Sequence, residues 1–194
     1  RPPGTAALAQ ATAPDPAVEA AVARLLASAR IPDPSVIQAQ ATGTGPGEAP
    51  RLSRGDRGWL RSVGAPPGGA FTLPPIAGPE APSERAARFL TEHAIAFGVA
   101  KRAVQLRADR IKVRDGRRFL RLSQEFRGIT VFSASAIVQL DTVGDVEFAL
   151  SDLARDDARF HHTDFAIAPI IGADEARALA LTVPELGPQV QDLV

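Results

Sequence analysis

The sequence lacks cysteine, methionine and tyrosine, and its 194 residues include three histidines and one tryptophan. Without cysteine, disulfides and thiolate metal sites are excluded. The 22 basic and 22 acidic residues cancel, so no overall charge attracts nucleic acid or an anionic membrane surface. No apolar run approaches the roughly 20 residues of a membrane-spanning helix. We therefore expect neither nucleic acid nor a membrane as a partner.

Proline is abundant in the chain but absent from residues 83–168, which indicates a compact unit between flanks rich in proline and glycine. We expect a Pro/Gly-rich N-terminal extension with a short helix and a linker, a strand-containing lead-in, a compact domain, and the incomplete start of a second module. These parts are residues 1–50, 51–80, 81–157 and 158–194. Because the chain starts at Arg1 and has no methionine, we expect a mature or engineered piece.

The segments before residue 81 are predicted to hold a short helix and two short strands. Asp15 is a suitable N-cap before Pro16, and apolar side chains follow at helical spacing until Pro32 stops the helix. Those side chains are Val18, Ala21, Val22, Leu25 and Ala29. Residues 59–63 and 71–73 are the predicted strands. A lone tryptophan beside leucine more often packs than stacks on a ligand, so we interpret Trp59 as a packing anchor.

The clearest element is an amphipathic helix predicted over residues 83–97. Ser83 is a suitable N-cap, and Gly98 suits the left-handed position just after a helix. A single stripe of mostly apolar side chains recurs at helical spacing, so this face must pack against a sheet or another helix. The stripe consists of Ala86, Phe89, Leu90, His93, Ala94 and Phe97.

Strands with alternating apolar residues follow the helix. They are predicted over residues 106–113, 119–126, 131–140 and 146–150, with turns at Asp115-Gly116, Arg127-Gly128 and 141–144. Short sequential turns favour an antiparallel β-meander covered on one face by the amphipathic helix, which is an α+β fold. The expected core joins Phe89, Leu90 and Phe97 of the helix to Leu120, Leu122, Val138 and Phe148 of the sheet.

We predict no catalytic, cofactor-binding or metal-binding residue in this chain. The HExxH pattern, which brings two imidazoles to one zinc ion, is absent. On the buried stripe, His93 is more plausible as a core histidine bonded to a backbone carbonyl than as a ligand or pH switch. His161 and His162 would point to opposite faces of a strand, so His162 and Asp164 would give two ligands where zinc needs three.

Three further features have plain interpretations. Gln124 lies on the inward face of an apolar strand, where we expect its amide to tie the strand to a loop or to His93. The acidic cluster lacks the spacing of a calcium-binding loop and is interpreted as a solvated face. This cluster contains Asp152, Asp156 and Asp157, with Arg155 and Arg159 between or beside them. Arg54-Gly55-Asp56 spells an adhesion tripeptide, which we interpret as a chance match.

Two spaced patterns lie within the compact domain. The helix carries FL..H...FG, and a later strand-turn-strand carries R-L-x-Q-x-x-x-G-x-x-V-F, followed by an aspartate–glycine turn. The residues are Phe89, Leu90, His93, Phe97, Gly98, Arg121, Leu122, Gln124, Gly128, Val131, Phe132 and Gly144. Over about residues 81–153 the chain resembles the FTP domain, the propeptide domain of fungalysin- and thermolysin-type zymogens. Family members usually carry glycines after the V-F pair, where this chain has Ser133-Ala134-Ser135.

The resemblance implies a cystatin-like fold and a non-catalytic propeptide of a secreted zinc metallopeptidase, located outside the cell or in the periplasm. The abundance of alanine and the use of arginine in place of lysine indicate a bacterial source. Such a prosegment acts as an intramolecular chaperone and as an inhibitor of the cleft until proteolytic removal. The implied partner is the mature peptidase domain, tethered in cis and then bound non-covalently. That domain would carry HExxH and bind zinc and calcium, whereas this chain would bind no cofactor. Residues 170–180 resemble the opening of a PepSY module.

The alternative is a free-standing binding module that inhibits proteases in trans or recognises an envelope ligand. An HExxH motif encoded beyond Val194 favours the propeptide, and a stop codon there favours the alternative. A third hypothesis, an enzyme fragment, requires activity from this chain alone.

Overall fold

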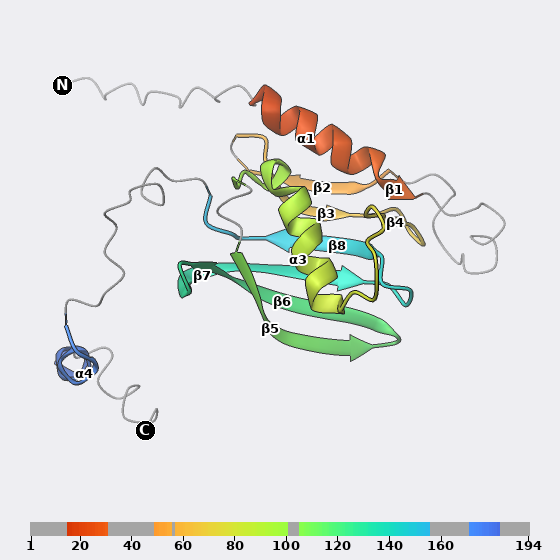
Figure 1. The fold of residues 1–194 in the computed structure, drawn as a ribbon. Helices are drawn as coiled ribbons and strands as arrows, with labels where there is room; N and C mark the ends of the chain where they lie inside the picture. The colour runs from red at the N-terminus through yellow and green to blue at the C-terminus, as the bar shows by residue number, and fades with distance from the viewer. Residues whose placement is uncertain (1–14, 31–48, 56, 101–104, 156–170, 183–194) are drawn as a thin grey trace, which may run out of the picture. The chain divides into compact units, whose positions relative to one another are not determined.

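The computed structural model of the chain describes residues 15–30, 49–55, 57–100, 105–155 and 171–182. These residues form three α-helices and an antiparallel sheet of eight strands, which confirms the α+β class (Figure 1). The strands are β1 (Ala29–Arg30), β2 (Arg51–Arg54), β3 (Leu60–Gly64), β4 (Ala70–Phe71), β5 (Gln105–Arg114), β6 (Arg117–Phe126), β7 (Ile129–Leu140) and β8 (Val146–Ser151). The chain divides into two compact units after residue 160.

The sheet has the order β1-β4-β8-β7-β6-β5, with β3 also paired to β8 and β2 paired to β3. Strands β5 to β8 therefore pair consecutively, as their short turns predict. Asp115-Gly116 and Arg127-Gly128 both have positive φ at their two residues, 51° and 76° in the first turn and 51° and 80° in the second. Positive φ at both positions matches the twist of the flanking strands, so these dipeptides make the predicted hairpins.

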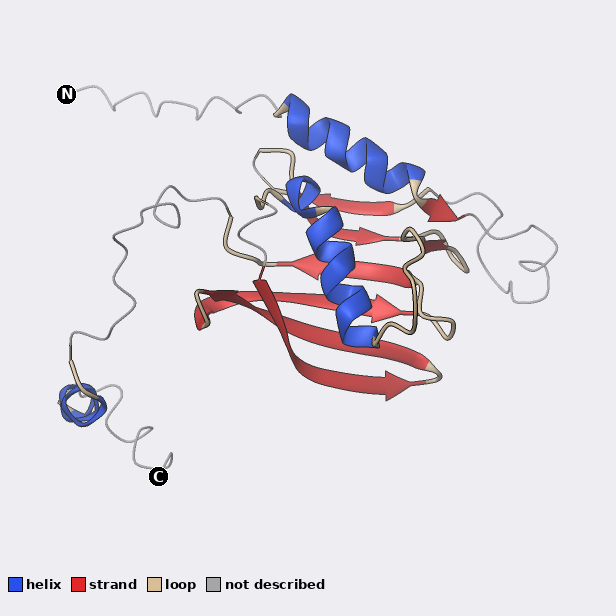
Figure 2. Cartoon of the chain, in the orientation of Figure 1, coloured by secondary structure: helices blue, strands red, loops and turns tan. Residues whose placement is uncertain are grey.

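Helix α3 (Pro82–Glu92) crosses one face of this sheet (Figure 2). The predicted N-cap at Ser83 is wrong: Ala81 is the N-cap, and Pro82 occupies the first helical position. The Ala81 N–H donates to Glu84 Oε2 at 3.0 Å, so a glutamate supplies the capping acceptor. The α-helix also ends earlier than predicted and tightens into the 3₁₀ helix η1 (Ala94–Phe97), after which Gly98 has a φ of +74°.

The predicted N-terminal helix is confirmed as α1 (Pro16–Ala27), with Asp15 Oδ1 accepting from the Ala17 N–H at 2.8 Å. The predicted place of Ala29 in this helix is wrong, because Ala29 begins β1 and pairs with Phe71. The apolar face of α1 enters the same core as α3. Residues 15–30 thus take part in the compact unit although sequence alone assigns them to an extension.

The predicted contact between α3 and the sheet is confirmed except at one position. Phe89, Leu90 and Phe97 are buried in one cluster with the sheet residues Leu120, Leu122 and Val138. Phe148 is outside this cluster because β8 contains a bulge. Gln139 pairs with Phe148 but Leu140 pairs with Val146, which leaves Glu147 as an extra residue.

The bulge reverses the alternation of β8, because one inserted residue moves every following side chain to the other face. Val146 is buried before the bulge, and Ala149 and Ser151 are buried after it. Phe148 and Leu150 consequently lie on the face of the sheet opposite α3. A strict alternation of apolar residues from Val146 to Leu150 is therefore wrong.

The second unit contains the described helix α4 (Ala173–Leu181), which has no buried residue. The sequence also predicts a strand over residues 160–167, which lie outside the described residues. None of the described helices is long and apolar enough to cross a membrane.

Replacing Phe89 by alanine is expected to lower the free energy of unfolding by about 3–5 kcal/mol, because the ring is fully buried between α3 and the sheet. Phe132→Ala is the matched control: its ring is 95% exposed, so we expect a change within about 0.5 kcal/mol. Urea denaturation followed by the circular dichroism signal measures both. Equal losses for the two variants would contradict this core.

Candidate functional site

The β6–β7 hairpin holds the residues of the strand-turn-strand pattern. In β6, Leu122 and Gln124 point into the core and are buried, whereas Arg121 lies on the opposite face and is exposed. Gly128 forms the turn with a φ of +80°, and Val131 and Phe132 follow in β7. The structure thus brings these residues together on one hairpin, with Leu122 and Gln124 on the inner face and Arg121 on the opposite face.

Gln124 is the buried polar residue of this hairpin and is only 2% exposed. Its Oε1 accepts from the Ala154 N–H at 2.7 Å, and its Nε2 donates to the Ala154 carbonyl at 3.4 Å. One amide therefore holds both polar groups of a single residue in the segment after β8. The prediction that Gln124 ties its strand to a loop is confirmed. Its partner could not be identified from the sequence, because Ala154 bonds through its backbone and has no polar side chain.

The segment held by Gln124 is fixed at two further points. Leu153 is buried in the core. The guanidinium carbon of Arg155 lies 4.6 Å from the centre of the Trp59 ring, within the range of a cation–π contact. Trp59 itself packs against the core cluster, which confirms its predicted role as a packing residue.

His93 is the C-cap of α3 and leads into η1. Its ring centre lies 4.9 Å from that of Phe89, at an interplanar angle of 60°. The imidazole is half-buried, so it packs beside the core and not fully within it. Phe89, Leu90 and Phe97 are buried, and Gly98 makes the left-handed exit from the helix.

The hairpin is irregular where β6 and β7 approach their turn. Ser123 pairs with Ser135, but Glu125 pairs with Thr130, so β7 has four residues (131–134) opposite the single residue Gln124. Within this bulge Ser133 has a φ of +59°, a conformation that is unfavourable for most residues other than glycine. Phe132 projects from the bulge and is 95% exposed. The bulge aims an aromatic ring into solvent.

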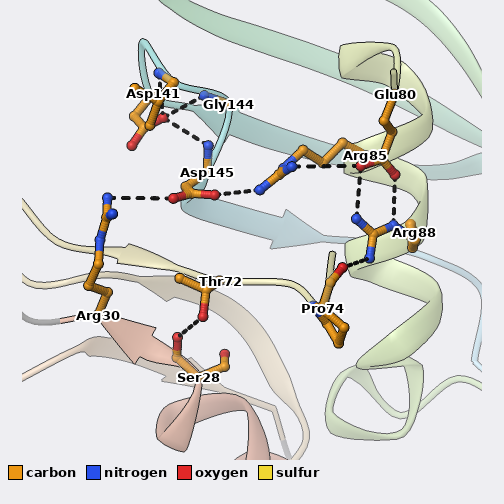
Figure 3. Close-up of polar contacts among 11 residues, drawn as sticks. Ser28, Arg30, Thr72, Pro74, Glu80, Arg85, Arg88, Asp141, Gly144 and Asp145 are labelled. Carbon is orange, nitrogen blue, oxygen red and sulfur yellow. Dashed lines mark hydrogen bonds and ion pairs between the residues drawn. The ribbon is translucent and has the colours of Figure 1, made fainter. Parts of the chain in front are cut away.

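At the other end of the sheet, charged side chains connect α3 to its surroundings (Figure 3). Arg88 donates to both carboxylate oxygens of Glu80 at 2.7 and 2.8 Å and to the Pro74 carbonyl at 2.9 Å. Arg85 forms an ion pair with Asp145, which lies 3.5 Å from Arg30 of β1. These contacts fix α3 to the loop before it, to the β7–β8 turn and to β1.

The β7–β8 turn is held by Asp141, as its place in the predicted aspartate–glycine turn suggests. Its Oδ1 accepts from the N–H groups of Val143, Gly144 and Asp145 at 2.9, 2.7 and 2.8 Å. Gly144 has a φ of +99°, which the absence of a side chain permits. The turn thereby presents Asp145 to Arg85 and Arg30.

The remaining candidates give no assembled site. His161, His162, Asp164, Asp156, Asp157 and Arg159 lie outside the described residues, as does Asp56. Asp152 accepts from Arg61 at 3.3 Å. Among the described residues no group of three histidine or acidic side chains could hold a metal ion.

Comparisons of the chain with protein-family models, with curated proteins and with solved structures gave no match.

Gln124→Leu is expected to lower the free energy of unfolding by about 1–3 kcal/mol, because a side chain of similar size leaves the Ala154 N–H and carbonyl without this partner. The Ala154 amide should also exchange with solvent deuterium faster than in the unmodified chain. Gln105→Leu on the exposed strand β5 is the control and should change neither quantity. An unchanged exchange rate in Gln124→Leu would show that the amide does not hold this segment.

Unfolding should also depend on pH through Glu80. The hydrogen bonds from Arg88, which outweigh the opposing effect of burial, lower the pKa of Glu80 below its ordinary value of 4.5. A carboxylate with a lowered folded-state pKa stabilises the fold fully above pH 4.5, and this contribution is lost as the pH falls through the folded-state value. We expect the urea concentration at the denaturation midpoint to decrease as the pH is lowered below 4.5. In Glu80→Gln this decrease should be less steep.

Glu175→Gln, at an exposed glutamate of α4, is the matched control and should keep the full pH dependence. If the denaturation midpoint depended on pH identically in Glu80→Gln and in the unmodified chain, Glu80 would not contribute to acid sensitivity.

Proposed function

We propose that the chain is the prosegment of a secreted zinc metallopeptidase of the thermolysin or fungalysin type. In this proposal residues 81–157 form an FTP domain with a cystatin-like arrangement of helix and meander, and residues 158–194 begin a PepSY module. The prosegment catalyses no reaction. It assists folding of its peptidase, blocks the cleft, and is removed by proteolysis.

The main support is the position of the pattern residues in the structure. The two patterns lie on α3 with η1 and on the β6–β7 hairpin, elements that share one core. Several polar and glycine positions of the patterns have specific structural roles, since Gln124 holds Ala154 while Gly98 and Gly128 have positive φ. A chance string of letters would not be expected to place its residues at such constrained positions.

Ser133 gives a second line of support. It follows the V-F pair, where the FTP pattern usually has glycine, and its φ of +59° is a conformation that glycine adopts without strain. The chain therefore differs from the pattern in the residue type at this position. The backbone there still has a conformation that favours glycine. A bulge here is consistent with the proposed family.

The proposed action is physically simple. A protease with many contacts between distant residues folds slowly, and a prefolded template bound to one part of it lowers the entropic barrier. A domain tethered to the cleft it blocks has a high effective concentration there, so inhibition persists until the tether is cut. The described residues supply a rigid template of this kind, with eight strands and two helices around one core.

The test uses the chain and the peptidase domain encoded beyond residue 194 as separate polypeptides. We expect an HExxH motif in that domain, a higher yield of active enzyme when it refolds with the chain, and reduced peptide hydrolysis at saturating chain. Phe89→Ala, which weakens the core, is the control and should lose both effects. A stop codon after residue 194 would favour the free-standing binding module, and unchanged refolding and hydrolysis would refute the prosegment.

A further inference from the structure

The face of the sheet opposite α3, here called the open face, is covered by no described element. Side chains that pair across strands share a face, so the register identifies its members. Ile137 pairs with Leu150, and Gln139 pairs with both Phe119 and Phe148. The four apolar members, Phe119, Ile137, Phe148 and Leu150, are half-buried or exposed, and Ile137 is 39% exposed. They form an apolar centre on β6, β7 and β8.

A basic border lies beside this apolar centre on β5 and β6. Arg110 pairs directly with Arg121, and Lys112 pairs with Phe119, so all three cations lie on the open face. All three are exposed. Within the described part of the chain, none of them has an ion-pair partner. Like charges at directly opposed positions repel, so an external anion would relieve this repulsion.

The neighbouring charges on the open face do not neutralise these cations. Glu147 accepts two hydrogen bonds from Arg117, at 2.7 and 3.1 Å, and one from Gln139 at 2.6 Å. Asp109 and Glu125 lie 3.4 and 3.3 Å from Arg107. Each acidic side chain is thus occupied by another partner, and the charge of the basic border remains.

An open depression of about 510 Å³ adjoins the apolar centre. Its walls come from β2, β3, β8 and the turn at residues 65–69, and Phe148 and Gln139 line its side toward the centre. A hollow beside an apolar surface suits an anchoring side chain of a partner, because buried anchors contribute most of the energy of an interface.

We infer that the open face binds an acidic protein surface with an apolar centre of its own. An apolar centre bordered by charge is the usual arrangement of a protein interface, and the unneutralised cations select a partner with carboxylates. A second copy of the chain docking through its own open face would bring the same unneutralised cations to the interface and, among the described residues of that face, no free carboxylates to match them. Phosphate backbones bind chiefly through positive charge, which leaves the four apolar side chains without a role. This inference does not rest on the proposed function.

The test needs no peptidase. Its probe is a peptide of alternating glutamate and leucine, compared with peptides in which serine replaces leucine or lysine replaces glutamate. We expect the glutamate–leucine peptide to bind most tightly, to bind more weakly as salt rises, and to shift the methyl NMR signals of Ile137 and Leu150. A DNA duplex and vesicles containing phosphatidylglycerol serve as competing anions and should bind more weakly than this peptide.

Reversing two charges by Arg110→Glu and Arg121→Glu together should weaken binding of this peptide by about tenfold or more. The matched control reverses Arg24 and Arg57, which are exposed and lie outside the open face. It should leave affinity unchanged. Thermal unfolding of both double variants confirms that they remain folded.

The inference is overturned if the glutamate–leucine peptide does not bind or binds equally well after reversal of Arg110 and Arg121. It is also overturned if the Ile137 and Leu150 methyl signals do not move. Tighter binding of DNA or vesicles would overturn it as well, because the open face would then be a site for a different anion.

Discussion

The fold depends on one shared apolar layer, in which the rings of Phe89 and Phe97 are buried against the inner face of the sheet. Neither partner could persist alone. The helix exposes an apolar stripe without the sheet, and a sheet needs one covered face to be stable. Helix α1 completes the same layer from the other end of the chain. The charged contacts of Arg85 and Arg88 fix the orientation of α3 on this core.

Much of this arrangement could be predicted from residue spacing, because helical and strand periodicities depend on local chemistry. The stripe on α3, the inward Leu120 and Leu122 and the Asp115-Gly116 hairpin all follow local rules. Prediction failed where a bulge interrupts a period, since no residue type near Glu147 marks the insertion that turns Phe148 outward. It also failed for β1 and β2, which are too short to show a period. Strand β1 in addition forms through pairing with the distant strand β4.

The candidate site divides in the same way. The buried amide of Gln124 could be expected to seek partners, because an unsatisfied polar group in a core is costly. Its choice of the Ala154 backbone could not be predicted, since any residue offers the same two groups. The positive φ of Ser133 could not be predicted either, because it arises within a bulge that depends on how β6 pairs with β7. The basic border required both the pairing of β5 with β6 and knowledge of which face α3 covers.

The hold of Gln124 on Ala154 also has a mechanical consequence. These residues are 30 positions apart, so the contact joins the chain leaving β8 to a strand two places away in the sheet. A force applied to the chain beyond residue 155 would first have to break the contacts that hold residues 153–155. These are the hydrogen bonds of the Gln124 amide, the burial of Leu153 and the contact of Arg155 with Trp59. Only then could β8 separate from β7. The segment after β8 is therefore expected to resist a force that would separate β8 from β7.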